Sequence, residues 1–181
     1  CTDRDPSILV RKRYDHVNLM QIRNLEFSMD WVFDSDASQE EVYEVVAERR
    51  VARVVQGYNV CLIAYGQTGS GKTHTVYGPQ EVLDDWEHSK PSQHGLAPRA
   101  VRDFFESVSR APAETQFLVS ASYCEVHNDS VNDLLSGRKN LALRETSGQR
   151  VKVEGLSAEV VSSPHRTGCC CARLGGCSES G

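Results

Sequence analysis

The sequence lacks any apolar stretch that approaches the ~20 residues needed to cross a bilayer. No charged segment leads into an apolar run at its start, so no secretory signal is predicted. It also lacks an excess of basic residues, because its 181 residues carry a net charge of -5. A broad electrostatic surface for nucleic acid is therefore not expected. These absences predict a cytosolic protein with no membrane span and no nucleic-acid partner.

A metal-binding pattern is also lacking, since no C-x-x-C pair occurs. Four of the seven cysteines lie between Cys169 and Cys177, near His165. Three of them are adjacent, and adjacent thiolates do not easily converge on one tetrahedral ion, so we do not expect a zinc site. Cys61 and Cys124 sit in apolar runs, where we expect reduced, structural thiols.

What is present has the composition of an ordinary globular domain, with 39% hydrophobic and 25% charged residues. The one short basic run, Arg11 to Arg13, is interpreted as a solvated strand edge and not as a binding arm. The chain begins with Cys1, which fits a fragment or a processed product.

The first half of the chain predicts a strand, a helix and a second strand. Apolar and polar residues alternate along 25–33, which places Phe27, Met29 and Trp31 on one face of a strand. Ser38 and Glu41 form a capping-box pattern, and Gly57 can end the helix that follows. Its apolar stripe consists of Val42, Val45, Val46, Ala47, Ala52, Val54 and Val55. Residues 58–65, apolar nearly throughout, predict a short buried strand.

The second half continues this alternation. Gly78 and Pro79 should end a short helix, and the polar residues 80–94 are predicted to be a surface insertion. Pro98 begins a second amphipathic helix. Further strands are expected at 117–126, 141–144, 151–153 and 156–161, with a turn of helix at 131–135. Alternating strands and helices predict an α/β sheet.

The residues that carry chemistry lie between the strand at 58–65 and the next helix. They match the phosphate-binding pattern G-x-x-x-x-G-K-[ST] in the strand-then-helix context that the pattern requires. Glycines let backbone N–H groups curl toward phosphate oxygens. Lys72 is expected at the β- and γ-phosphates and Thr73 at Mg²⁺. The predicted phosphate-binding residues are Gly66, Gln67, Thr68, Gly69, Ser70, Gly71, Lys72 and Thr73.

A complete hydrolase needs more than this loop. Phosphoryl transfer also requires an aspartate at the end of a second strand and a residue that positions water. The strand at 117–126 has no aspartate at its tip, and Asp133 is interpreted as structural because Asp133 to Gly137 has one residue too many for D-x-x-G. No complete catalytic set is therefore predicted. An unrelated phosphate-loop kinase or GTPase would need a base-reading motif such as N-K-x-D, and the sequence contains none.

Taken together, these segments resemble the N-terminal half of a kinesin motor domain. YGQTGSGKTHT, residues 65–75, is a kinesin-like form of the phosphate loop. The other matching segments follow in the family's order, at 33–34, 39–43, 57–59, 95–100, 122–128, 131–135, 143–145 and 151–156. The resemblance covers Asp30 to about Pro164.

The resemblance implies a P-loop NTPase sheet with flanking helices, incomplete at its C-terminal side. It implies Mg²⁺-ATP as the nucleotide, with His74 stacking near the adenine, and microtubules as the partner. The family's Arg-x-Arg-Pro segment and both switch motifs, N-x-x-S-S-R-S-H and D-L-A-G-S-E, have no match here. We expect an N-terminal edge segment at 1–24, a partial motor domain at 25–164, and a divergent disordered tail at 165–181.

Two functions follow from this resemblance. The first is a fragment of a microtubule motor, whose parent would hydrolyse ATP to move along microtubules in the cytoplasm. The fragment by itself would bind ATP without effective hydrolysis. The second is a truncated, non-enzymatic isoform that acts as a nucleotide- or protein-binding module.

Overall fold

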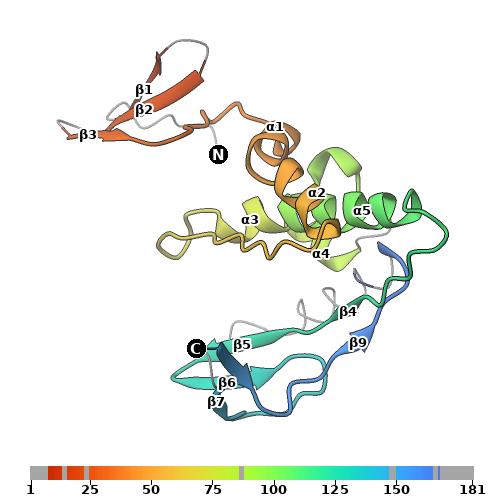
Figure 1. The fold of residues 1–181 in the computed structure, drawn as a ribbon. Helices are drawn as coiled ribbons and strands as arrows, with labels where there is room; N and C mark the ends of the chain where they lie inside the picture. The colour runs from red at the N-terminus through yellow and green to blue at the C-terminus, as the bar shows by residue number, and fades with distance from the viewer. Residues whose placement is uncertain are drawn as a thin grey trace.

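The computed structural model describes residues 8–13, 16–22, 25–85, 88–146, 150–164 and 167. Figure 1 shows a small N-terminal sheet, a group of helices in the middle, and a group of strands on the other side of the helices. The tail predicted at 165–181, with its four cysteines, lies outside the described residues apart from Thr167. Within the described part of the chain, no helix is long and apolar enough to cross a membrane.

The N-terminal sheet has three antiparallel strands in the order β1-β2-β3. They are β1 (Ile8–Arg13), β2 (His16–Ile22) and β3 (Leu25–Ser28). The basic run lies on β1, an edge strand, as predicted. The strand predicted at 25–33 is wrong beyond Ser28, because the ladder to β2 stops there. Met29 and Trp31 consequently lie exposed and do not pack on a common buried face.

The predicted long helix after Ser38 is confirmed, although it is not uniform. It runs through α1 (Gln39–Tyr43), a π-helical turn η1 (Glu44–Glu48) and α2 (Arg49–Val55). Ser38 Oγ accepts a hydrogen bond from the backbone N–H of Glu41 at 3.1 Å, as the capping pattern predicts. Gly57 follows the helix with φ +92°, a conformation that favours glycine.

The π-helical turn changes which residues face the core. Tyr43, Ala47 and Val51 are buried at a spacing of four, and they pack with Leu96. Val54, which a regular helical stripe places on the buried face, is exposed instead. A π-helix turns more slowly than an α-helix, so the stripe read from 3.6-residue spacing drifts off the core.

The second predicted helix is α5 (Leu96–Ser109), which packs against α1, η1 and α2. Tyr43 donates its hydroxyl to Asp103 on α5 at 2.7 Å. Along the chain, three short elements separate α2 from α5. They are α3 (Lys72–Val76), α4 (Gln80–Asp84) and a 3-10 turn, η2 (Pro91–Gln93). The surface insertion predicted at 80–94 is only partly right, because Val82 is 1% exposed and belongs to the interior.

The buried strand predicted at 58–65 is wrong in this structure. These residues form no strand, and Ile63 and Tyr65 are 83% and 98% exposed. Among the described residues no strand pairs with them, so they form no buried strand of a sheet. Tyr58 instead lies under Arg53, whose guanidinium carbon is 5.4 Å from the ring centroid. Cys61 is free and exposed, as is Cys124, so neither thiol serves as the small core residue that we expected.

The remaining strands form three two-stranded antiparallel sheets. They are β4 (Ser120–Ala121) with β9 (Glu159–Val160), β5 (Cys124–His127) with β6 (Ser130–Asp133), and β7 (Leu143–Thr146) with β8 (Arg150–Val153). The strand predicted at 117–126 is thus split in two. The helical turn predicted at 131–135 is wrong, because residues up to Asp133 continue a hairpin with β5.

Candidate phosphate-binding loop

The candidate site is the loop of residues 66–71, which leads directly into α3 at one side of the helical group (Figure 1). Gly66 and Lys72 are half-buried, whereas the residues from Gln67 to Gly71 are exposed. The loop is therefore open to a ligand from solvent while its two ends are held by the fold.

The glycines of the loop are required by its backbone conformation. Gly69 and Gly71 have φ values of +80° and +89°, which residues with a side chain rarely adopt. At Gly66 the constraint is space, because a Cβ would lie 2.4 Å from Ser70 Oγ. The loop also closes a turn in which the N–H of Ser70 donates to the carbonyl of Gln67 at 3.2 Å. The sequence pattern thus corresponds to a curled backbone.

The Lys72 side chain reaches back to the first two residues of the loop. Its Nζ donates to the carbonyl oxygens of Gly66 and Gln67 at 2.9 Å and 2.8 Å. These two hydrogen bonds hold a full positive charge at the start of the loop. Because α3 has only five residues, its dipole contributes little, and this charge is the main attraction for an anion.

Thr73 and His74 follow on α3, and both are exposed. The carbonyl of Thr73 accepts the N–H of Tyr77 at 2.8 Å, which anchors its backbone in the helix. Nowhere among the described residues do three or more His, Cys, Asp or Glu side chains gather to hold a metal. The Thr73 hydroxyl lies one residue after Lys72, in the first turn of α3.

The structure adds one residue that the sequence pattern does not mark. Gln39, at the start of α1, donates through Nε2 to the carbonyl of His74 at 2.8 Å. The same nitrogen lies 3.1 Å from Nδ1 of the His74 ring. These residues are 35 positions apart, and the fold brings the start of α1 to His74 on α3. A motif search within the loop has no means of detecting this contact.

Asp133, the nearest sequence candidate for a switch aspartate, lies in a different part of the fold. Its carboxylate is buried and accepts from the N–H groups of Leu135, Ser136 and Ser157 at 2.9, 3.2 and 2.8 Å. Ser136 Oγ donates to it at 2.7 Å. These bonds join the aspartate to its own turn and to the loop between β8 and β9, and this supports the structural interpretation.

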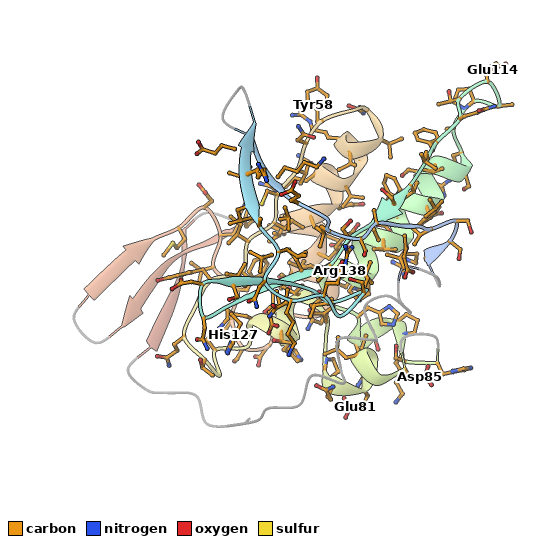
Figure 2. The ribbon with its side chains drawn as sticks, turned by 90° about the horizontal axis from the view of Figure 1, so that it is seen from below. Tyr58, Glu81, Asp85, Glu114, His127 and Arg138 are labelled. Carbon is orange, nitrogen blue, oxygen red and sulfur yellow. The ribbon has the colours of Figure 1, made fainter. Side chains whose placement is uncertain are left out.

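The titration of Asp133 reflects these bonds. Burial acts to raise the pKa of the carboxyl, but the hydrogen bonds from Ser136 and Ser157 outweigh it and hold the pKa well below its usual range. Arg138, labelled in Figure 2, lies 3.8 Å from the carboxylate and donates to Ser157 Oγ at 3.2 Å. The folded structure therefore favours the charged form of the carboxyl, which links the turn after β6 to Ser157.

Comparison with known proteins places these elements in one family. A family model described as the kinesin motor domain matches residues 5–172, which extends past the predicted range of 30–164 at both ends. The chain is 41% identical over 135 residues to kinesin-related protein 3 of Dictyostelium discoideum. It is 42% identical over 139 residues to the kinesin heavy chain of Doryteuthis pealeii. These matches cover 74% and 76% of this chain.

A solved structure gives the same result for the fold. The chain matches a fast kinesin, described for its ATPase mechanism and its interactions with microtubules, with a TM-score of 0.76 and 30% identity. The match covers 97% of this chain and 46% of that chain. The chain spans only 11% and 14% of the length of the two curated relatives. The predicted α/β fold of kinesin-motor type is confirmed.

Proposed function

Because the chain belongs to the kinesin motor domain family, we propose that it binds Mg²⁺-ATP through residues 66–74. In a longer protein this site would serve a cytoplasmic motor that hydrolyses ATP to move along microtubules. The observation that carries the proposal is the loop itself, with Lys72 Nζ held at the carbonyls of Gly66 and Gln67. A charged lysine on a curled glycine loop is suited to a polyphosphate.

The loop passes a test of fit for a triphosphate. No atom lies within 4 Å of a Cβ built at Gly69 or Gly71, so the space above the backbone at these positions is open. Side chains at these two positions would fill it and would also be strained by the positive φ. The same features that exclude side chains therefore leave room for phosphate oxygens beside the loop amides.

Each residue of the loop has a separate role in this proposal. Lys72 would neutralise the terminal phosphates, and the Thr73 hydroxyl would hold Mg²⁺. His74 would present its ring to the base. When bound, Mg²⁺-ATP supplies a phosphoryl group whose transfer to water releases the free energy for movement. The residues described here bind and orient that group.

Magnesium dependence tests the proposal directly. A fluorescent ATP analogue should bind the purified 181-residue chain saturably, and more tightly with Mg²⁺ than with EDTA. In Thr73→Val we expect this magnesium-dependent gain to fall by about tenfold, because the valine keeps the shape and loses the oxygen ligand. Binding in EDTA should be unchanged. Thr115→Val, at an exposed position far from the loop, is the matched control.

The result that would count against the proposal is equal magnesium enhancement in both variants. A loss of binding in EDTA for Thr73→Val alone would instead indicate a disturbed loop. Circular dichroism of each variant separates that case from a change in metal binding.

Hydrolysis by residues 1–181 alone should stay near the uncatalysed background. The sequence has no counterpart of either switch motif, so no residue is available to position water or to respond to the γ-phosphate. Phosphate release should be measured with and without microtubules, at a saturating concentration of ATP. A rate that rises with microtubule concentration would show that the 181-residue chain carries its own catalytic set.

One observation favours a second function, that of a non-enzymatic protein-binding module. Ile63, Tyr65 and Leu118 are each more than 80% exposed, although they belong to apolar runs. Backbone that is unpaired and bears exposed apolar side chains is suited to pairing with another chain. The ATP titration separates the two functions, since a chain that acts only through this surface would give no saturable, magnesium-dependent binding.

A further inference from the structure

We infer that Gln39 is a positioning residue of the nucleotide site, which holds the His74 ring as the neutral tautomer with its proton on Nε2. The inference rests on the proposed function only for the claim that the ring serves a nucleotide. The tautomer itself is a property of the protein without ligand.

The argument starts from the two contacts of one nitrogen. Gln39 Nε2 lies 2.8 Å from the carbonyl oxygen of His74 and 3.1 Å from its ring Nδ1. The amide nitrogen carries two hydrogens and has no lone pair to offer, so both of its partners must be acceptors. Nδ1 is an acceptor only when it carries no proton. The proton of the neutral ring is therefore on Nε2.

The orientation of the Gln39 amide is fixed by the same geometry. An amide of glutamine can often be turned over without visible change, which exchanges its oxygen and nitrogen. Here the turned amide would place its oxygen 2.8 Å from the carbonyl oxygen of His74, and two acceptors at that distance repel each other. The backbone carbonyl thus selects the orientation in which the amide donates to the ring.

Gln39 is well placed to hold an exposed ring because its own helix is anchored. The preceding Ser38 caps α1 by accepting the N–H of Glu41. Four residues later, Tyr43 is buried against α5 and bonds to Asp103. The amide therefore extends from a fixed helix start onto α3. His74, which is exposed, gains an orientation that α3 alone does not impose.

This arrangement determines what the ring offers to a ligand. With Nδ1 occupied by Gln39, the remaining polar atom of the ring is the donor Nε2–H. A neutral ring held in one orientation presents a flat face and a single donor, which suits a purine base.

The tautomer can be read by nitrogen NMR of the ligand-free 181-residue chain. Long-range proton–nitrogen correlations distinguish the two neutral tautomers, and the His74 signals are those that disappear in His74→Ala. We expect the wild type to show Nε2–H alone. In Gln39→Glu the carboxylate accepts an N–H from Nδ1, so the signals should change to the Nδ1–H or the charged form. Gln56→Glu, at an exposed helix end, should leave them unchanged.

A double-mutant cycle tests the link to the nucleotide. Gln39→Met keeps the length of the side chain and removes the donor. It should therefore raise the Kd of the ATP analogue by about threefold to tenfold. In a His74→Ala background the same change should have no further effect, because Gln39 acts through the ring. An equal loss in both backgrounds would overturn the positioning role, as would His74 signals that do not change in Gln39→Glu. If the tautomer behaves as expected but no variant binds nucleotide, the proposed function fails and the positioning of the ring stands.

Discussion

Replacing Lys72 with methionine should weaken binding of the ATP analogue by at least about a hundredfold. The side chain supplies the one full positive charge of the loop, and a hydrogen bond to a charged group contributes about 1.5–3 kcal/mol. Loss of two such contacts to phosphate oxygens corresponds to about 3 kcal/mol or more, which is a factor of about a hundred or more in Kd. Methionine keeps the apolar stem, so the loss reports the charge and not the packing.

The effect has a second component, because Lys72 also binds the loop that it serves. Its bonds to the carbonyls of Gly66 and Gln67 help hold the curl in the absence of ligand. Lys72→Arg retains the charge but its planar guanidinium does not reproduce the same pair of bonds, so it should bind more weakly than wild type and more tightly than Lys72→Met. Titration of the three proteins would rank these contributions.

Lys139→Met is the matched control, since it removes an exposed lysine from a turn distant from the loop. Its affinity should stay within twofold of wild type. If the control and Lys72→Met lose affinity equally, the attraction comes from the general charge of the chain. If Lys72→Met binds normally, the loop is not the nucleotide site.

The loop could be predicted from sequence because its constraints are local. Gly69 and Gly71 need positive φ whatever surrounds them, and Gly66 must lie close to Ser70. The same is true of Ser38, whose capping bond spans three residues. Where the forces act over a few residues, a pattern of residue types specifies the geometry.

The strand at 58–65 shows the opposite case. Its apolar composition is typical of a buried strand, but a strand exists only when another strand pairs with it. Within the described residues no such partner is present, and Ile63 lies 83% exposed. The prediction of a buried strand was therefore wrong, because the position of a pairing strand could not be read from the apolar run itself.

Long-range contacts account for the other differences. The turn of helix predicted at 131–135 does not form, because positive φ at Asn128 and Asp129 reverses the chain. Residues up to Asp133 then pair with β5. Gln39 acquires its role only when the fold brings the start of α1 to His74 on α3. Neither outcome depends on the local pattern alone, since each is decided by the contact between separate segments.

Asp133→Asn should destabilise the hairpin region by about 1–3 kcal/mol, a sizeable part of the 5–15 kcal/mol by which small domains are stable. In the native structure both carboxylate oxygens accept backbone N–H groups, Oδ1 from Leu135 and Oδ2 from Ser157. Asparagine has only one oxygen. Its amide nitrogen would face a backbone N–H in a buried site, which leaves donors without acceptors.

The control is Glu125→Gln, which makes the same chemical change at an exposed carboxylate on the partner strand β5. It should alter the free energy of unfolding by no more than about 0.5 kcal/mol. Urea unfolding measures the global effect, and hydrogen exchange at the amides of Leu135 and Ser157 measures the local one. Equal stability of the two variants would mean that the Asp133 bonds do not hold the hairpins.

The pH dependence gives an independent test of the same anchor. Because the folded state holds the pKa of Asp133 below its usual value near 3.9, the unfolded chain binds this proton first as pH falls. The contribution of the carboxylate is therefore fully present above about pH 5 and is lost progressively as the pH drops below about 4. The stability gap between wild type and Asp133→Asn should narrow over that acidic range, whereas the gap between wild type and Glu125→Gln should stay small. A gap that is constant down to pH 2 would show that the charge of Asp133 is not what the hydrogen bonds stabilise.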